Sequence, residues 1–147
     1  AARVTFAADL HQAGDIGRAT QEYETVLNSE PGSVLALNNL AWLYHENRDP
    51  RALELAERAY NALPQRPEIM DTYGWLLVES GKVERGLKLL QPAAERAPDN
   101  ADIAFHYAAA LARAGDKFNA REILENLLSR ATAFSEREAA EDLLKTL

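Results

Sequence analysis

The strongest indication of the fold is Asn39-Leu40-Ala41-Trp42-Leu43-Tyr44, because related stretches follow it at Thr72-Tyr73-Gly74-Trp75-Leu76-Leu77 and at His106-Tyr107-Ala108-Ala109-Ala110-Leu111. Small residues mark the same place in each stretch and one period earlier, 34, 33 and 34 residues apart, at Ala7, Ala41, Gly74 and Ala108. A second small series follows 11 or 12 residues later, at Ala19, Ala52, Gly86 and Ala120. A fixed period of this length indicates a repeat architecture.

Each period is typical of two amphipathic helices, since apolar residues recur at spacings of three and four, as at Leu87, Leu90 and Ala94. Turn signals separate the two helices at Gly14-Asp15, Asn47–Pro50, Gly81-Lys82 and Gly115-Asp116. Prolines end three of the units, at Pro31, Pro64 and Pro98. The small residues allow the two helices to approach closely. The sequence therefore predicts repeats at 1–33, 34–66, 67–100 and 101–134.

The last segment predicts a capping helix over 135–147. Ser135 and Glu138 have the spacing of a capping box, with serine at the N-cap and glutamate three residues later. Ala139, Leu143 and Leu144 then fall on one face of the helix. A terminal repeat needs such a helix, apolar inside and polar outside, to cover its exposed end. Repeat one has no equivalent, which raises the expectation of self-association through this N-terminal repeat or of further repeats before it.

Composition excludes several classes of function. The 147 residues are 47% apolar and 27% charged, with no cysteine, which excludes disulfide frameworks and cysteine-ligated metal sites. The net charge of -7 disfavours nucleic acid as a partner, because a phosphate backbone needs a basic face. No apolar run approaches the roughly 20 residues of a membrane span, so we expect no direct membrane insertion of this stretch.

The period, the paired helices and the small residues together resemble the tetratricopeptide repeat family. The family's large apolar residue beside the first small one is present in every unit, as Phe6, Leu40, Tyr73 and Tyr107. The resemblance covers nearly the whole chain. It implies an all-α, right-handed α-solenoid of four helix-turn-helix repeats plus the C-terminal capping helix, as a single domain over 1–147.

The resemblance also implies a site for a protein or peptide partner in a concave groove lined by the first helix of each repeat. The candidate groove residues are Asn38, Asn39, Trp42, His45, Asp71, Thr72, Trp75, Phe105 and His106. Asparagine offers both a donor and an acceptor to a peptide backbone, and tryptophan is a frequent anchor at interfaces. The alternative interpretation is that Trp42 and Trp75 pack between neighbouring helices as core.

The segments Leu37–Leu43 and Asp71–Leu77 resemble more narrowly the C-terminal repeats of tetratricopeptide lipoproteins in PEP-CTERM/exosortase systems, which accompany bacterial exopolysaccharide export. That resemblance implies a scaffold in the periplasm or at the outer membrane, although the residues themselves leave a cytoplasmic location open.

No enzyme motif is present, so we expect no catalysis, no cofactor and no metal site. His45-Glu46 lacks the second histidine of a zinc-protease motif, and no glycines precede Gly81-Lys82 at phosphate-loop spacing. Two alternatives to a peptide-binding scaffold remain. One is a self-assembly or spacer module that uses the first repeat. The other is an accessory that handles glycans, with the tryptophans stacking on sugar rings.

Overall fold

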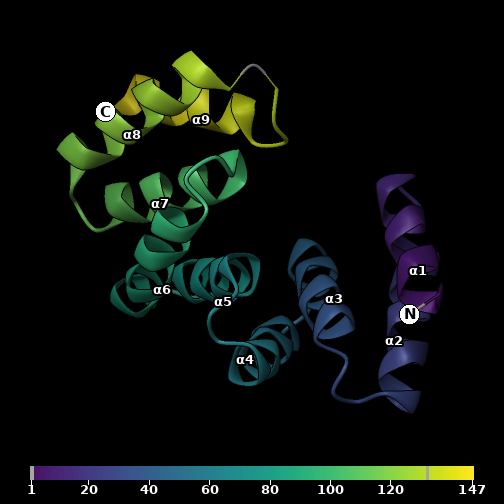
Figure 1. The fold of residues 1–147 in the computed structure, drawn as a ribbon. Coiled ribbons are helices and arrows are strands. Elements are labelled where there is room, and N and C mark those ends of the chain that lie inside the picture. The colour runs from purple at the N-terminus through teal and green to yellow at the C-terminus, as the bar shows by residue number, and fades with distance from the viewer. Residues whose placement is uncertain (1, 132) are drawn as a thin grey trace. The chain divides into compact units, whose positions relative to one another are not determined.

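The computed structural model describes residues 2–131 and 133–147, and every regular element in this part of the chain is an α-helix (Figure 1). The helices are α1 (Ala2–Gln12), α2 (Ile16–Ser29), α3 (Val34–Glu46), α4 (Ala52–Ala62), α5 (Pro67–Glu79), α6 (Val83–Arg96), α7 (Ala101–Arg113), α8 (Lys117–Arg130) and α9 (Arg137–Thr146). The predicted all-α fold of helix pairs followed by a C-terminal helix is confirmed. Residues 1 and 132, which fall in the first and fourth predicted repeats, lie outside the described part.

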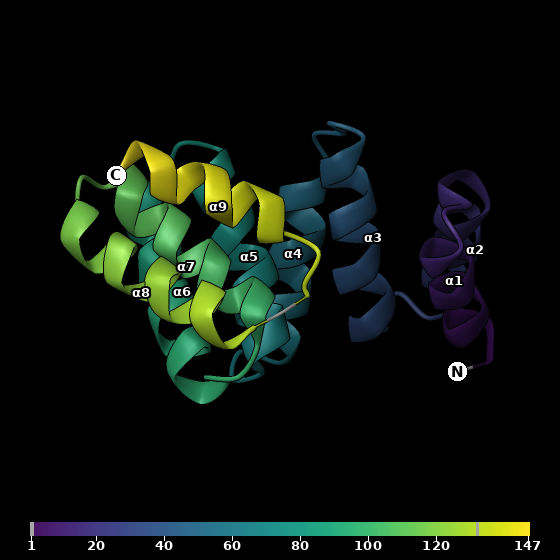
Figure 2. The same ribbon diagram turned by 90° about the horizontal axis from the view of Figure 1, so that it is seen from above.

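The first eight helices pair within the predicted repeats. α3, α5 and α7 begin at Val34, Pro67 and Ala101, where the second, third and fourth repeats were expected to start. By their internal contacts, residues 1–65 and 66–147 form two compact units. The first unit holds α1 to α4, and α1 lies beside α2 in both views of the ribbon (Figures 1 and 2). The second unit holds α5 to α9. That the whole chain forms one domain remains a prediction.

The turn between the two helices of each repeat has the same backbone geometry. Gly14, Gly81 and Gly115 have φ of +84°, +89° and +90°, the left-handed region that glycine adopts without steric cost. The residue after each glycine donates its N–H to a carbonyl five residues earlier, as Asp15 does to Leu10 at 2.9 Å. In repeat two the same position is Arg48, at φ +56°. The predicted turns are thus confirmed, and one of them places a non-glycine residue in a conformation that glycine would adopt more easily.

The small residues bring the two helices of a repeat into contact. The six alanines of the two small series are all buried at the helix pairs. In repeat three both positions are glycine. A Cβ built on Gly86 would lie 2.4 Å from Cγ2 of Val78 and 2.6 Å from the carbonyl oxygen of Gly74. The backbones of α5 and α6 therefore touch, and the core of the repeat closes around this contact with Leu77 and Leu90 buried on either side.

α9 packs beside α8, with Ala140 completely buried (Figure 2). The predicted capping box is wrong. α9 begins at Arg137 with Glu136 at the N-cap position, and no side chain caps its first turn. The physical reason is a competing tertiary contact, since the Ser135 hydroxyl donates to Oδ1 of Asp102 on α7 at 2.9 Å. None of the helices within residues 2–131 and 133–147 is long and apolar enough to cross a membrane.

The contact at Gly86 yields a first testable prediction. Gly86→Ala should lower the free energy of unfolding by about 1–3 kcal/mol, because the added methyl group forces α5 and α6 apart. Alanine would otherwise favour the helix by about 1 kcal/mol over glycine, so the steric cost must exceed that gain. The change is measured by urea denaturation, with the circular dichroism signal of the helices as the readout.

Two alanine substitutions serve as controls for Gly86→Ala. At Gly74 the nearest atom to the new Cβ lies 3.0 Å away, so Gly74→Ala should cost less than Gly86→Ala. At Gly17, in α2, nothing lies within 4 Å of the new Cβ, so Gly17→Ala should leave stability unchanged or raise it. Equal stability of the Gly86→Ala and Gly17→Ala proteins would contradict the backbone contact.

Candidate functional site

The nine candidate groove residues lie on three helices. α3 carries Asn38, Asn39, Trp42 and His45, α5 carries Asp71, Thr72 and Trp75, and α7 carries Phe105 and His106. The first group belongs to unit 1–65 and the other two to unit 66–147. That all nine share one groove remains a prediction.

The residues of α3 are largely engaged within their own unit. The side-chain amide of Asn39 donates to the Tyr23 hydroxyl on α2 at 3.1 Å. Trp42 meets His45 edge to face, with ring centroids 5.9 Å apart, and both side chains are half-buried. The side-chain oxygen of Asn38 is buried and has no hydrogen-bond partner among the described residues. The partly accessible candidates in unit 1–65 are therefore Asn39, Trp42 and His45, of which Asn39 is already bonded to Tyr23.

The residues of α5 and α7 form a tight cluster. His106, which is 4% exposed, lies with Nδ1 2.8 Å from Oδ1 of Asp71, which is 6% exposed. The imidazole N–H donates to the carboxylate, so each buried polar group satisfies the other. Thr72 is fully buried, and its hydroxyl donates to the backbone carbonyl of Glu68 at 2.9 Å. Asp71 and His106 thus join α5 to α7 inside the unit, whereas the Thr72 hydroxyl bonds within α5.

Trp75 lies between this buried cluster and the surface. Its ring stacks on His106, with centroids 4.6 Å apart and planes 20° from parallel, and it also contacts Phe105. The Arg113 guanidinium carbon lies 5.1 Å from the Trp75 ring centroid, and Arg113 forms an ion pair with Glu79 at 2.7 Å. With 8% of its surface exposed, Trp75 packs as core and also lines a surface hollow.

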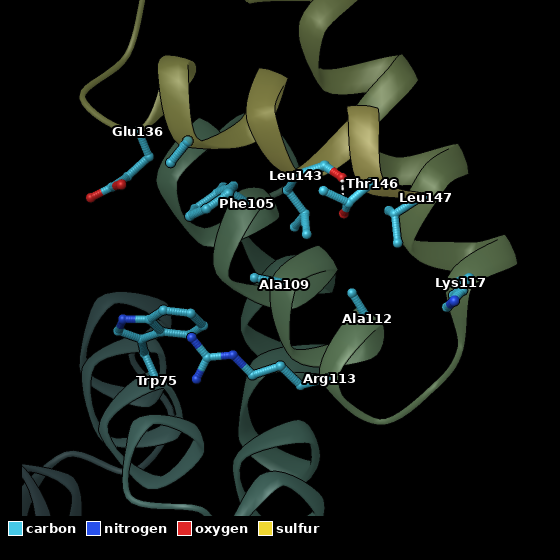
Figure 3. Close-up of a pocket in the computed structure, with 11 residues that line it drawn as sticks. Trp75, Phe105, Ala109, Ala112, Arg113, Lys117, Glu136, Leu143, Thr146 and Leu147 are labelled. Atoms are coloured by element: carbon cyan, nitrogen blue, oxygen red, sulfur yellow. Dashed lines mark hydrogen bonds between the residues drawn. The ribbon is translucent and has the colours of Figure 1, made fainter.

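A hollow of about 550 Å³ opens beside Trp75, between α5, α7 and α9 (Figure 3). We call it the α9 hollow. Most of its lining is apolar, and its charged members are Arg113, Lys117 and Glu136. The apolar and uncharged lining residues are Trp75, Phe105, Ala109, Ala112, Ala139, Leu143, Thr146 and Leu147. Among the candidate residues from sequence, the structure brings Trp75 and Phe105 to this hollow, while His106 supports Trp75 from beneath.

Reasoning from sequence missed the contribution of α9, which was expected only to cover the end of the last repeat. The signal was present, since Ala139, Leu143 and Leu147 follow one another at intervals of four and share one face of a helix. That face lines the hollow, whereas the buried contact of α9 is made by Ala140, one position further on.

Unit 1–65 has a smaller hollow of about 380 Å³ between α2, α3 and α4, where Tyr44 already contacts Glu24 and Arg51. The Tyr44 hydroxyl donates to Oε1 of Glu24 at 2.6 Å, and the Arg51 guanidinium lies 4.3 Å from the centre of the Tyr44 ring. Burial, followed by the hydrogen bond to Glu24, raises the pKa of Tyr44 to about 12. Because these groups satisfy each other, the α9 hollow is the stronger candidate site. Within residues 2–131 and 133–147, no three His, Cys, Asp or Glu side chains gather in a way that could hold a metal ion.

Comparison with known proteins gives a family and a set of related folds. A family model described as tetratricopeptide repeat matches residues 4–131. A TPR repeat-containing protein of Pseudomonas aeruginosa is 30% identical over 94 residues, which are 63% of this chain and 16% of that protein. The chain therefore spans less than a fifth of the length of this curated relative.

Solved structures show the same fold. Pseudomonas aeruginosa pilF, solved for its functional characterization, has a TM-score of 0.74 at 20% identity, covering 87% of this chain and 59% of that one. A mutant of the Thermobaculum terrenum O-GlcNAc transferase gives 0.79 at 26% identity, covering 88% of this chain and 25% of the transferase chain. YrrB, described as a TPR protein with an unusual peptide-binding site, gives a TM-score of 0.70 at 20% identity, covering 87% of this chain and 66% of that one.

The Asp71–His106 pair supports a second prediction. Asp71→Ala leaves the buried imidazole without its acceptor, so it should lower the free energy of unfolding by about 1–3 kcal/mol. Asp99→Ala removes the same group at an exposed position and should change stability by less than about 0.5 kcal/mol. Both are measured by urea denaturation. Equal stability of the two variants would mean that the buried pair does not hold α5 and α7 together.

Proposed function

The chain belongs to the tetratricopeptide repeat family, and we propose that it is a non-catalytic scaffold that binds a peptide or a partner helix in the α9 hollow. Tetratricopeptide repeat proteins generally mediate protein–protein interaction, and the fold is typically a scaffold rather than a catalyst. The unusual peptide-binding site described for YrrB belongs to that protein and supports the same class of ligand here.

The observation that carries the proposal is the composition of the hollow. Apolar side chains from three helices surround it, and tryptophan and arginine, which dominate many interface hot spots, lie at its edge. Its volume of about 550 Å³ accommodates several side chains of a ligand. Trp75 is held by His106 and Arg113 before any ligand arrives, which reduces the entropy lost on binding.

The tested ligand is a synthetic peptide selected from a random phage-displayed library of peptides of about 15 residues, enough for four helical turns. Ala139 is exposed and lines the hollow, so Ala139→Trp should fill it without disturbing the core. We expect this variant to bind the selected peptide about tenfold more weakly or worse, measured by fluorescence polarisation, with an unchanged melting temperature.

The matched control is Glu138→Trp, which adds the same side chain at an exposed neighbouring position that does not line the hollow. It should bind the peptide like the parent protein. If selection yields no peptide whose binding Ala139→Trp weakens, the hollow is not a peptide site and the proposal fails.

Self-assembly through the first repeat is a second candidate function, and one observation favours it. Phe6 is 43% exposed, whereas Leu40 and Tyr73, at the equivalent place in the next two repeats, are 1% and 6% exposed. An exposed phenylalanine at a position that the next two repeats bury favours association with another apolar surface. Light scattering over a concentration series tests it. Assembly is supported if the molecular mass of the parent protein grows with concentration while that of Phe6→Glu stays at the value of a monomer. A constant mass in both proteins would refute this candidate function.

We also propose a place for the scaffold in bacterial envelope assembly, linked to exopolysaccharide export. The support is the likeness of Leu37–Leu43 and Asp71–Leu77 to repeats of such systems. Antibody detection in fractionated cells tests it, and recovery only in the cytosol would refute it. The geometry gives no support to sugar stacking on Trp75, because His106 and Arg113 already lie against its ring.

A further inference from the structure

The charged side chains of the α9 hollow are distributed unevenly along it. Figure 3 shows Glu136 at one end and Lys117 at the other, on the side of Leu147, with Phe105, Ala109 and Leu143 between them. Glu136 stands at the N-cap of α9, and Lys117 opens α8. A ligand in the hollow therefore meets an acidic group at one end, an apolar floor, and a basic group at the other end.

Both end charges are available to a ligand. The side chains of Glu136 and Lys117 make no hydrogen bond or ion pair with another residue in the part of the chain that the structure describes. Arg113 differs, because it is already paired with Glu79 and lies over Trp75. Glu136 is half-buried and Lys117 exposed, so Glu136 in particular loses hydration when a ligand covers it unless the ligand compensates its charge.

The length of the hollow matches three turns of helix. From Glu136 to Leu147 the chain rises about 16 Å along α9, at about 1.5 Å per residue. Ala139, Leu143 and Leu147 line the hollow at helical spacing, and a partner helix with apolar residues at spacings of three and four presents a matching stripe.

The two end charges also fit the ends of a helix. A helix carries a partial positive charge at its N-terminus and a partial negative charge at its C-terminus, so it is stabilised by an acid at the first end and a base at the second. An extended peptide has no comparable dipole, and its main chain leaves both charges without compensation. This difference favours a helix over an extended segment.

We infer that the occupant of the α9 hollow is an amphipathic helix of about three turns that runs in the same direction as α9, with its N-terminus at Glu136 and its C-terminus at Lys117. The inference rests on the proposed function, since it specifies the ligand of that same hollow. The inference also states the direction of the bound helix. An experiment on that direction can therefore refute the inference while peptide binding itself still holds.

The first experiment measures direction. The selected peptide is synthesised with a nitroxide label at its first or at its last residue and added to the full chain labelled with nitrogen-15. We expect the first label to broaden the amide signals of residues 136–139 and the last label to broaden those of residues 113–117. The reverse pattern, or a bound peptide without helical chemical shifts, overturns the inference while leaving peptide binding intact.

The second experiment reverses the two end charges. Glu136→Lys combined with Lys117→Glu should weaken the same peptide by about three- to tenfold, because both helix ends then face like charge. The matched control is Glu84→Lys combined with Lys88→Glu, which reverses two charges on α6 away from the hollow and should leave affinity unchanged. Equal affinity of the two double variants also overturns the inference. If Ala139→Trp does not weaken binding of the peptide, the result refutes instead the proposed function on which this inference rests.

Discussion

The close approach of the two helices within each repeat determines how the other elements can pack. In repeat three the backbones of Gly74 and Gly86 meet so closely that even a methyl group at Gly86 would clash. Alanines perform the same function in the other repeats. Because each pair is fixed at its centre, the side chains on the outer faces of α5 and α7 acquire fixed positions, and packing between successive repeats becomes predictable.

The candidate site uses that rigidity. Asp71 and His106 are 35 residues apart in sequence, and they meet because α5 and α7 occupy equivalent places in successive repeats. Their hydrogen bond fixes the ring on which Trp75 stacks. α9 then supplies the remaining wall. Short-range pairs and one buried polar contact thus fix this surface without a ligand, which suits the proposed scaffold.

Sequence alone predicted most of the fold and a smaller part of the site. The small-residue series located the helix pairs, and Gly14, Gly81 and Gly115 located three turns, because these signals act through local backbone geometry. The start of α9 was wrong because Ser135 bonds to Asp102, a contact across 33 residues that no local spacing reveals. The same limit applies to Trp75, since its partial burial depends on His106 and Arg113, which lie on another helix.

The two faces of α9 make different contacts. Ala140 on one face is buried, while Ala139 and Leu143 on the other face line the α9 hollow. The residues that line the proposed binding site can therefore diverge without altering the residue that holds the helix in place. For the proposed scaffold, the consequence is that substitutions in this one short segment would change which partner is bound while the sequence of the repeats stays the same.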